Sequence, residues 1–436
     1  MTMVGERITL RPAAAPSSAR VHPVEEVVTK KGVRAYLIHE PALPFLSMGF
    51  YFRGGAAVDP SDRPGLAYMA MGLLDEGAGP YDSQAFREQL EDNAIRLHFD
   101  ADRDGLSGEL KTLSSQRDHA FELLRLALHE PRFDAEPVER VRGQITAELR
   151  RLEAEPNYLA SRAWFERAFP GHPYGRPTRG TPETVAALTR DELTGFPASR
   201  LGRDNLCVGV SGDITAEALA PLLDHAFGDL ASPGVRPEPE ALAPVIGATV
   251  IVRLRNPQSV VTFGGPALPR LHPDYYAAYV ANYILGGGGF ASRLTEEIRE
   301  KRGLAYSVYS YLYDLDHSPL WLGGVATKNE QVAESIRLIR QELQGLAQGR
   351  VEEQELTDAK TYLTGSFALR LTSNDQVAKT LVSMLDVGLG RDYLERRNAL
   401  IEAVTLDDVR RVAAQLYGVE PLFAIAGAPE GVSEGA

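Results

Sequence analysis

The strongest constraint on the fold of this chain is a repeat, because features of its first half recur 216 residues later. Thr189–Glu192 predicts the start of a helix, with threonine and glutamate side chains satisfying free backbone N–H groups in a capping box. The apolar run Leu206–Val210 follows and predicts a buried strand. Thr405–Asp408 and Leu422–Ala426 repeat this order at the same spacing. The repeat predicts an internally duplicated fold with two similar halves.

The domain organisation follows from this repeat. Glu139 and Glu355 lie in acidic helical segments of the two halves and keep the same offset. Residues 231–248 are rich in proline, which disfavours helices and central strands and is typical of a semi-rigid linker. A chain of 436 residues also exceeds what one hydrophobic core usually serves. We therefore expect an N-terminal domain at residues 20–230 and a C-terminal domain at residues 249–430.

Both strands and long amphipathic helices are expected within these domains. Val27–Ile38 and Phe45–Phe52 are apolar and β-branched enough to predict strands. Ser83–Asn93 and Pro137–Glu155 predict helices, the second with an apolar face at helical spacing. This mixture predicts an α+β fold of two homologous domains, each a mainly antiparallel sheet packed against helices.

Charge and hydropathy exclude several classes of function. The net charge of −13, without any Lys/Arg-rich run, argues against nucleic-acid binding. No apolar stretch approaches the roughly 18 residues that a spanning helix needs, so we expect no membrane span. The first thirty residues lack the apolar core of a signal peptide. Two origins fit that start: a cytoplasmic protein, or a periplasmic protein whose leader has been removed.

The histidines and the cysteine argue against a metal site made by this chain alone. No two histidines are three or four residues apart, so no pair shares one helical face. The single Cys207 excludes a cysteine-built zinc site. We expect no metal cofactor in this chain. The nine histidines are His22, His39, His98, His119, His129, His172, His225, His272 and His317.

Four segments, in a consistent order along the chain, carry a resemblance to a known family. They are Phe52–Ala56, Leu74–Gly79, Gly171–Pro177 and Leu285–Ser307. Together they resemble the pitrilysin/insulinase family of zinc metallopeptidases, which includes the mitochondrial processing peptidases. The likeness extends from about Val24 to Gly427, and the family's two-domain duplication agrees with the repeat.

The resemblance also exposes a missing site. The family binds zinc with His-x-x-Glu-His and a distant glutamate, and here Tyr68, Met71 and Gly72 stand where His, Glu and His would be. The distant glutamate corresponds best to Glu148, although an isolated glutamate on a charged helix usually faces solvent. A catalytic zinc needs three protein ligands of N, O or S type. The resemblance therefore implies a degenerate zinc site, with Tyr68 and Met71 as packed side chains.

The second half retains two residues that the family uses on its substrate. Family enzymes hold the substrate backbone with an arginine and a tyrosine seven residues apart, and Arg299 and Tyr306 match both types and spacing. A guanidinium and a phenol can donate to carbonyl oxygens and to a developing oxyanion. Arg302 is a neighbouring, less favoured candidate. A glycine run precedes this element, as a flexible turn or as a substrate-handling loop: Gly286, Gly287, Gly288 and Gly289.

The resemblance implies a zinc-less subunit of a heterodimeric metallopeptidase. A homologous partner subunit would supply the zinc, and an extended peptide or unfolded protein would be the substrate. Two alternatives stay open: a non-enzymatic scaffold like the respiratory core proteins, or a protein that captures peptides without cutting them. A homodimer of the isolated chain is also compatible. His172, between Gly171 and Pro173, is expected to shape a turn.

Overall fold

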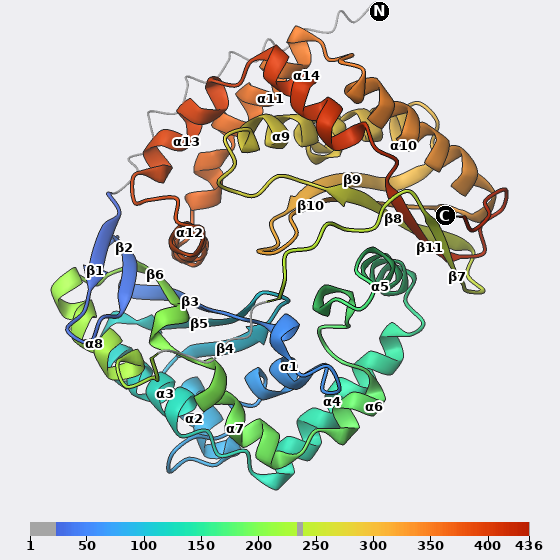
Figure 1. The fold of residues 1–436 in the computed structure, drawn as a ribbon. Coiled ribbons are helices and arrows are strands. Elements are labelled where there is room, and N and C mark those ends of the chain that lie inside the picture. Colours follow the sequence, from blue (N-terminus) through green and yellow to red (C-terminus); the bar gives the residue numbers. More distant parts are fainter. Residues whose placement is uncertain (1–22, 233–238, 436) are drawn as a thin grey trace, which may run out of the picture.

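The computed structural model describes residues 23–232 and 239–435 (Figure 1). These residues form two mixed sheets, one in each half of the chain, and each sheet is covered by helices. The predicted α+β fold of two homologous domains is therefore confirmed. In Figure 1 the first half, blue to green, lies below the second half, yellow to red.

The first sheet has six strands in the order β1-β2-β6-β3-β5-β4. The β2 and β6 strands are parallel and all other neighbours are antiparallel. The expected single strand Val27–Ile38 is wrong, because Gly32 at φ +86° turns the chain and makes a hairpin of it. The strands are β1 (Glu25–Val28), β2 (Arg34–His39), β3 (Phe45–Arg53), β4 (Arg96–Ala101), β5 (Gly105–Leu113) and β6 (Leu206–Gly212).

The second sheet repeats this topology with five strands in the order β7-β11-β8-β10-β9. Here β11 occupies the place of β6, between a parallel neighbour, β7, and an antiparallel one, β8. The capping boxes predicted at Thr189 and Thr405 are both present, each at the start of the helix that leads into the central strand. The strands are β7 (Thr249–Arg253), β8 (Gln258–Pro266), β9 (Ala305–Tyr313), β10 (Leu320–Lys328) and β11 (Leu422–Gly427).

Most helices cover the outer faces of the two sheets (Figure 1). In the first half they are α1 (Leu66–Met71), α2 (Ser83–Asp92), α3 (Arg117–His129), α4 (Ala135–Leu152), α6 (Pro182–Ala187), α7 (Arg190–Arg200) and α8 (Ala216–Phe227). In the second half they are α9 (Tyr275–Asn282), α10 (Val332–Ala347), α11 (Glu353–Gly365), α13 (Tyr393–Glu402) and α14 (Leu406–Tyr417). The predicted helices over Ser83–Asn93 and Pro137–Glu155 thus correspond to α2 and α4.

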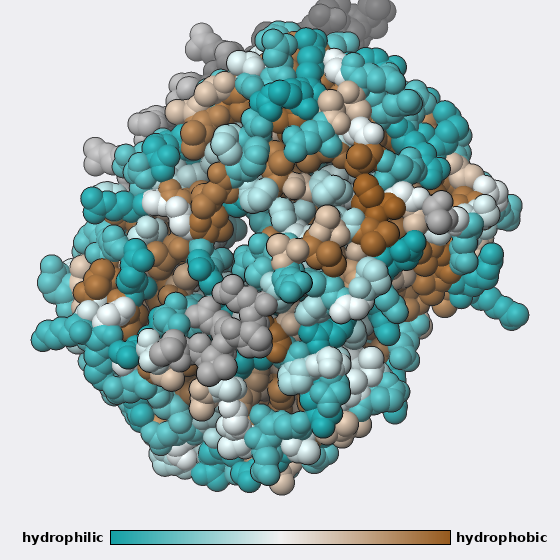
Figure 2. Space-filling model, viewed as in Figure 1, coloured by the Kyte–Doolittle hydropathy of each residue, from teal (hydrophilic) through white to brown (hydrophobic). Residues whose placement is uncertain are grey.

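Two helices cross to the opposite half and cover the inner faces of the sheets. The α12 helix (Asn374–Val387) packs on β2, β6 and β3 of the first sheet. The α5 helix (Pro156–Ala168) packs on β7, β11 and β8 of the second, where the indole N–H of Trp164 donates to the carbonyl of Leu422 over 3.1 Å. Figure 2 shows hydrophobic residues concentrated near the boundary between the halves. The halves therefore share their inner packing.

The predicted linker at residues 231–248 lies partly outside the described residues, because residues 233–238 are not among them. Its described end is tied to the fold, since the N–H of Val245 donates to the carbonyl of Ala168 over 2.8 Å and Ala248 is buried. The domain boundaries at residues 20–230 and 249–430 stay predictions. Along the described chain, no helix has both the length and the apolar character needed to cross a bilayer.

Candidate functional site

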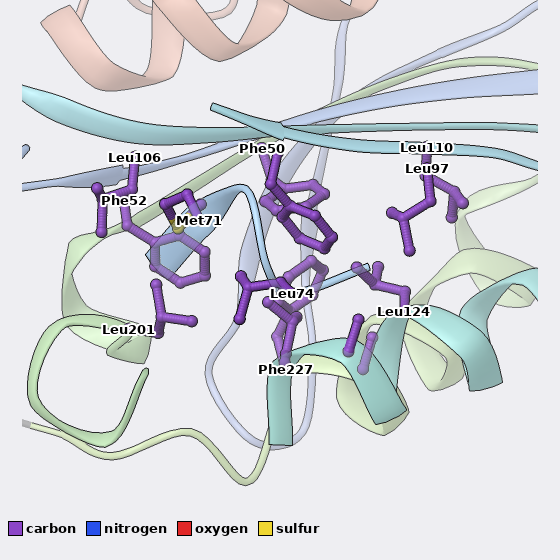
Figure 3. Packing of buried hydrophobic residues seen from close by; sticks show 14 of the residues in the cluster. Phe50, Phe52, Met71, Leu74, Leu97, Leu106, Leu110, Leu124, Leu201 and Phe227 are labelled. Atoms are coloured by element: carbon purple, nitrogen blue, oxygen red, sulfur yellow. The ribbon is translucent and has the colours of Figure 1, made fainter. Parts of the chain in front are cut away.

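The first candidate region is α1, the helix that carries Tyr68 and Met71, which the resemblance places at the zinc motif. Gly65, at φ +94°, begins this short helix and Gly72 ends it. Met71, which we expected at the position of the general base, is fully buried. Figure 3 shows it packed with Phe52, Leu106 and Leu201 in the core beneath the first sheet. A thioether in this apolar setting serves packing, and Met71 cannot activate a water molecule.

Tyr68 and Glu148 lie on the neighbouring helices α1 and α4, but each is engaged with an arginine. The guanidinium carbon of Arg179 lies 5.0 Å from the centre of the Tyr68 ring. Glu148 accepts two hydrogen bonds of 2.9 Å from Arg151, and this arginine lowers the pKa of the Glu148 carboxyl. Among the described residues no three His, Cys, Asp or Glu side chains lie close enough to hold a metal ion. The residues present at this position do not fit zinc.

The second candidate region brings together Arg299, Tyr306 and a residue that sequence reasoning missed, Phe290. The Arg299 guanidinium carbon lies 4.5 Å from the centre of the Phe290 ring and 5.0 Å from that of Tyr306. Tyr306 is 85% exposed and Phe290 69% exposed. Two aromatic faces thus hold a guanidinium in place by cation–π contacts on the surface of the protein. We call these three residues the arginine cluster.

The polar atoms of the arginine cluster are available to a ligand. Within the described chain, the Tyr306 hydroxyl has no hydrogen-bond partner, and the one carboxylate beside Arg299 is Glu300, 3.4 Å from its Nε. Arg302 differs, because its Nη1 donates to the Glu297 carboxylate over 2.5 Å and to the Glu297 carbonyl over 2.8 Å. The structure therefore distinguishes the two arginines: Arg299 has one long ion pair, with Glu300, whereas Arg302 lies in a turn and is held by Glu297 of the preceding π-helical segment, Thr295–Glu300.

The glycine run shapes the approach to this cluster. It joins a π-helical segment, Tyr283–Gly287, to a short turn, Gly289–Ala291, that carries Phe290. A Cβ at Gly286 would lie 2.6 Å from the backbone nitrogen of Ser310 on β9, and Gly289 has φ +57°. The glycines thus allow close packing on β9 and the turn that presents Phe290.

The strand that carries Tyr306 lies at the edge of the second sheet. Among the described strands, β9 is hydrogen-bonded to β10 alone. Tyr309 and Tyr311, stacked with ring centres 6.1 Å apart, are both exposed on the same face. The alternation of tyrosines at 309, 311 and 313 was the sequence signal for this aromatic face. An edge strand with an aromatic face can accept an extended peptide as an added strand.

His172 holds a turn together, as expected. Its Nδ1 accepts a hydrogen bond of 3.1 Å from the backbone N–H of Tyr174, and its Nε2 lies 2.9 Å from the carbonyl oxygen of Glu240. Both ring nitrogens are therefore engaged with backbone groups. His172 shapes the loop before α6.

Comparison with family models identifies the class of protein. Residues 34–182 match the model described as Insulinase (Peptidase family M16), and residues 187–363 match the Peptidase M16 inactive domain. The chain therefore belongs to peptidase family M16, and the resemblance predicted from its sequence is confirmed. It does so without the family's His-x-x-Glu-His motif.

Individual relatives and structures agree with this assignment. The chain is 28% identical to the "Non-peptidase homolog YmxG" of Helicobacter pylori, over 84% of its own length and 85% of the relative. Its fold matches a peptidase M16 inactive domain structure from Pseudomonas fluorescens, with TM-score 0.87, 24% identity, and 94% and 98% of the two chains covered. It also matches a chain of Complex III2 from Candida albicans, with TM-score 0.77, 18% identity, and 93% and 96% covered.

Proposed function

We propose that this chain is the zinc-less subunit of a heterodimeric metallopeptidase. The observation that carries the proposal is the arginine cluster, Phe290, Arg299 and Tyr306, which is pre-arranged and exposed although α1 carries no side chain that suits zinc. Exposed aromatic side chains around a cation are characteristic of binding surfaces. The H. pylori relative described as a non-peptidase homolog supports a member that does not cut peptides alone.

In this proposal the catalytic chemistry is divided between two subunits. A homologous partner would supply His-x-x-Glu-His and a zinc ion, which polarises the scissile carbonyl and activates water. The guanidinium of Arg299 and the phenol O–H of Tyr306 would donate to substrate carbonyl oxygens beside that bond. Such donors stabilise negative charge as it develops on the oxyanion. The rings of Phe290 and Tyr306 reduce the freedom of Arg299 before substrate arrives, which lowers the entropy cost of binding.

The proposed substrate is an extended peptide or an unfolded segment of a protein. Among the described strands β9, which carries Tyr306, pairs with β10 alone, so it could offer backbone groups to a peptide outside the stretch where Asn282 and Thr295 donate to the carbonyls of Ser310 and Val308. Backbone hydrogen bonds would supply most of the affinity, and sequence preference would be loose. The exposed Tyr309 and Tyr311 would contact apolar side chains on one face of the bound peptide.

A peptidase assay of the mixed subunits tests the proposal. We expect no cleavage by this chain alone and strong cleavage by an equimolar, zinc-loaded mixture with the homologous subunit. Arg299→Ala should lower kcat/KM of the mixture by about 100-fold, and Tyr306→Phe by about 10-fold, as for the removal of oxyanion donors. Arg302→Ala is the matched control, because Arg302 is held by Glu297, and it should leave kcat/KM within about twofold.

Other outcomes would decide for the rival functions. A mixture no more active than the zinc-bearing partner alone would indicate a scaffold. Tight binding of fluorescent peptides by the isolated chain, without cleavage by any mixture, would indicate a peptide-capturing protein. Zinc-dependent proteolysis by the purified chain alone would refute the proposal outright.

A further inference from the structure

The second half contains a cavity of about 350 Å³ away from the arginine cluster. It lies where α9 and α13 meet α12, the helix that crosses to the first sheet (Figure 1). Its size is within the range of small-molecule sites. The lining residues are Arg270, Tyr275, Tyr276, Tyr279, Phe367, Arg370, Lys379, Thr380, Ser383, Met384, Leu389, Tyr393 and Arg397.

The lining of this cavity is strongly basic, with three arginines, one lysine and no carboxylate among the described lining residues. Arg397 is 5% exposed, and its Nη1 donates to the Leu363 carbonyl and to Asn398, each over 3.1 Å. Neither partner carries a charge. A buried cation without a counter-charge is unfavourable for the fold, so its presence is consistent with a ligand that supplies the negative charge.

Arg270 is likewise surrounded by aromatic rings and has no ion pair among the described residues. Its Nη2 donates to the hydroxyl oxygens of Tyr393, over 2.8 Å, and Tyr276, over 3.3 Å, and its guanidinium carbon lies 4.2 Å from the centre of the Tyr275 ring. These phenol oxygens accept from the arginine, and the Tyr276 and Tyr393 hydroxyls also hydrogen-bond each other, which leaves one O–H group of the pair to donate to an anion. Burial raises the pKa of Tyr393 to about 12, which keeps that donor protonated at neutral pH.

The acidic residues nearest the cavity are held by other groups. The Tyr275 hydroxyl donates to Asp314 over 2.9 Å, and Arg396 pairs with Asp392 over 2.5 Å. Lys379 pairs with Glu109 of β5 at 2.6 Å. Arg370 is exposed and has no ion pair within the described chain. Arg270, Arg370 and Arg397 therefore form no ion pair among the described residues, although the charge of Arg270 acts on Asp314 and opposes the rise in its pKa caused by burial.

We propose that this cavity binds a small molecule that carries a phosphate group. The phosphate would lie among Arg270, Arg370 and Arg397, and the organic part against the tyrosine rings. Guanidinium groups pair well with phosphate, which offers several acceptor oxygens and about two negative charges. The cavity has room for an organic group as well as the phosphate, and aromatic walls favour a planar one. The inference is independent of the proposed peptidase partnership.

The position of the cavity gives such a ligand a structural effect. The α12 helix lies on the first sheet, whereas α9 and α13 belong to the second half. A ligand held between them would connect the two halves. Because it would bind the folded chain and not the unfolded one, it would also raise the melting temperature.

Calorimetric titration of the full chain with phenyl phosphate, inorganic phosphate, benzoate and phenol tests this proposal. We expect phenyl phosphate to bind most tightly, inorganic phosphate and benzoate about tenfold or more weakly, and phenol not at all. The affinity for phenyl phosphate should fall as salt is raised, because the contacts are between charges. Phenyl phosphate should also raise the melting temperature.

Substitutions locate the site. Arg270→Gln should weaken phenyl phosphate binding by about tenfold or more, and Arg370→Gln, at the exposed rim, by about threefold. Arg150→Gln removes the same charge from the exposed surface of α4 and should change nothing. Arg370→Gln keeps the test decisive if Arg270→Gln disturbs folding. Equal binding of phenol or benzoate, an effect of Arg150→Gln as large as that of Arg370→Gln, or no binding of phenyl phosphate would overturn the proposal.

Discussion

At the scale of single residues, the partners of a charged group decide what it can do. Arg299 and Arg302 are neighbours in the sequence, yet one lies between two exposed rings and the other is bound to Glu297. Glu148, which the resemblance matches to a metal ligand, pairs with Arg151. Residue type and spacing identified these side chains as candidates. Their contacts then distinguished Arg299, which packs between exposed aromatic rings, from Arg302 and Glu148, which are held by short ion pairs.

Glu76 illustrates a charge with a structural role. It follows α1 and accepts hydrogen bonds from Arg140 of α4, over 2.5 Å and 3.2 Å, and from Ser83 of α2, over 2.6 Å. Burial alone would raise its pKa, but the hydrogen bonds from Arg140 and Ser83 outweigh burial and hold the pKa below its usual value. The ionised carboxylate thus connects the segment after α1 to α2 and α4.

Replacing Glu76 should therefore destabilise the protein in a pH-dependent way. A lowered folded-state pKa contributes stability above the unfolded-state pKa and loses it as the pH falls through the folded-state value. Glu76→Gln should lower the free energy of unfolding by about 2 kcal/mol at pH 7, with a smaller difference near pH 3. Urea denaturation at both pH values measures it. Glu136→Gln, which removes a more exposed partner of Arg140, should cost less than about 0.5 kcal/mol; a Glu76 effect that did not depend on pH would contradict this account.

At the scale of elements, the α12 helix packs close to the strands of the first sheet. Gly49 on β3 and Gly209 on β6 face each other in the register, directly under this helix. A Cβ at Gly209 would lie 2.4 Å from the carbonyl oxygen of Ala378 and 2.7 Å from the backbone nitrogen of Val382. Glycine weakens a strand in isolation, but here it allows a helix to approach the sheet closely.

A side chain at Gly209 should therefore displace α12. Gly209→Ala is expected to lower the free energy of unfolding by about 1–3 kcal/mol, the usual cost of overpacking against backbone atoms. Gly143→Ala is the matched control, because a Cβ there meets no atom within 4 Å and α4 gains a better helix former. It should stabilise the protein by about 0.5–1 kcal/mol. Urea unfolding of both variants measures the contrast, and a neutral Gly209→Ala would argue against the close packing.

At the scale of the whole molecule, neither half completes its own packing. Trp164 and Phe165 of α5 lie in one buried cluster with Leu320, Leu322 and Leu422 of the second half. In return, α12 covers the first sheet and links to it through an ion pair of 2.9 Å between Asp375 and Lys111. A half expressed alone would expose both its inner sheet face and its crossing helix.

We therefore expect residues 20–230 and 249–430 to fold poorly as separate chains. Each should aggregate or bind a hydrophobic dye, because large apolar surfaces remain uncovered. Co-expression should recover a soluble complex with the near-ultraviolet circular dichroism of the intact protein. An isolated half with a cooperative thermal transition and native-like near-ultraviolet signal would show that the exchanged helices are dispensable.

The sequence alone determined the elements that depend on local pattern. The repeat predicted two similar halves, the capping boxes at Thr189 and Thr405 predicted two helix starts, and the apolar runs after them predicted buried strands. These signals are readable because caps and apolar runs act within a few residues. Residue type and spacing likewise identified Arg299 and Tyr306 as candidate substrate-binding residues.

Contacts between distant segments were decided by the tertiary structure alone. The exchange of α5 and α12, the packing of Phe290 on Arg299 and the basic cavity under α13 join residues far apart in the chain or across a turn. Even the β1–β2 turn depended on the φ of Gly32, where the apolar pattern suggested one strand. Amphipathic helices of similar pattern can pack on either sheet, because the hydrophobic effect rewards buried area and is not directional. Shape complementarity chooses between the sheets, and it exists only in the folded molecule.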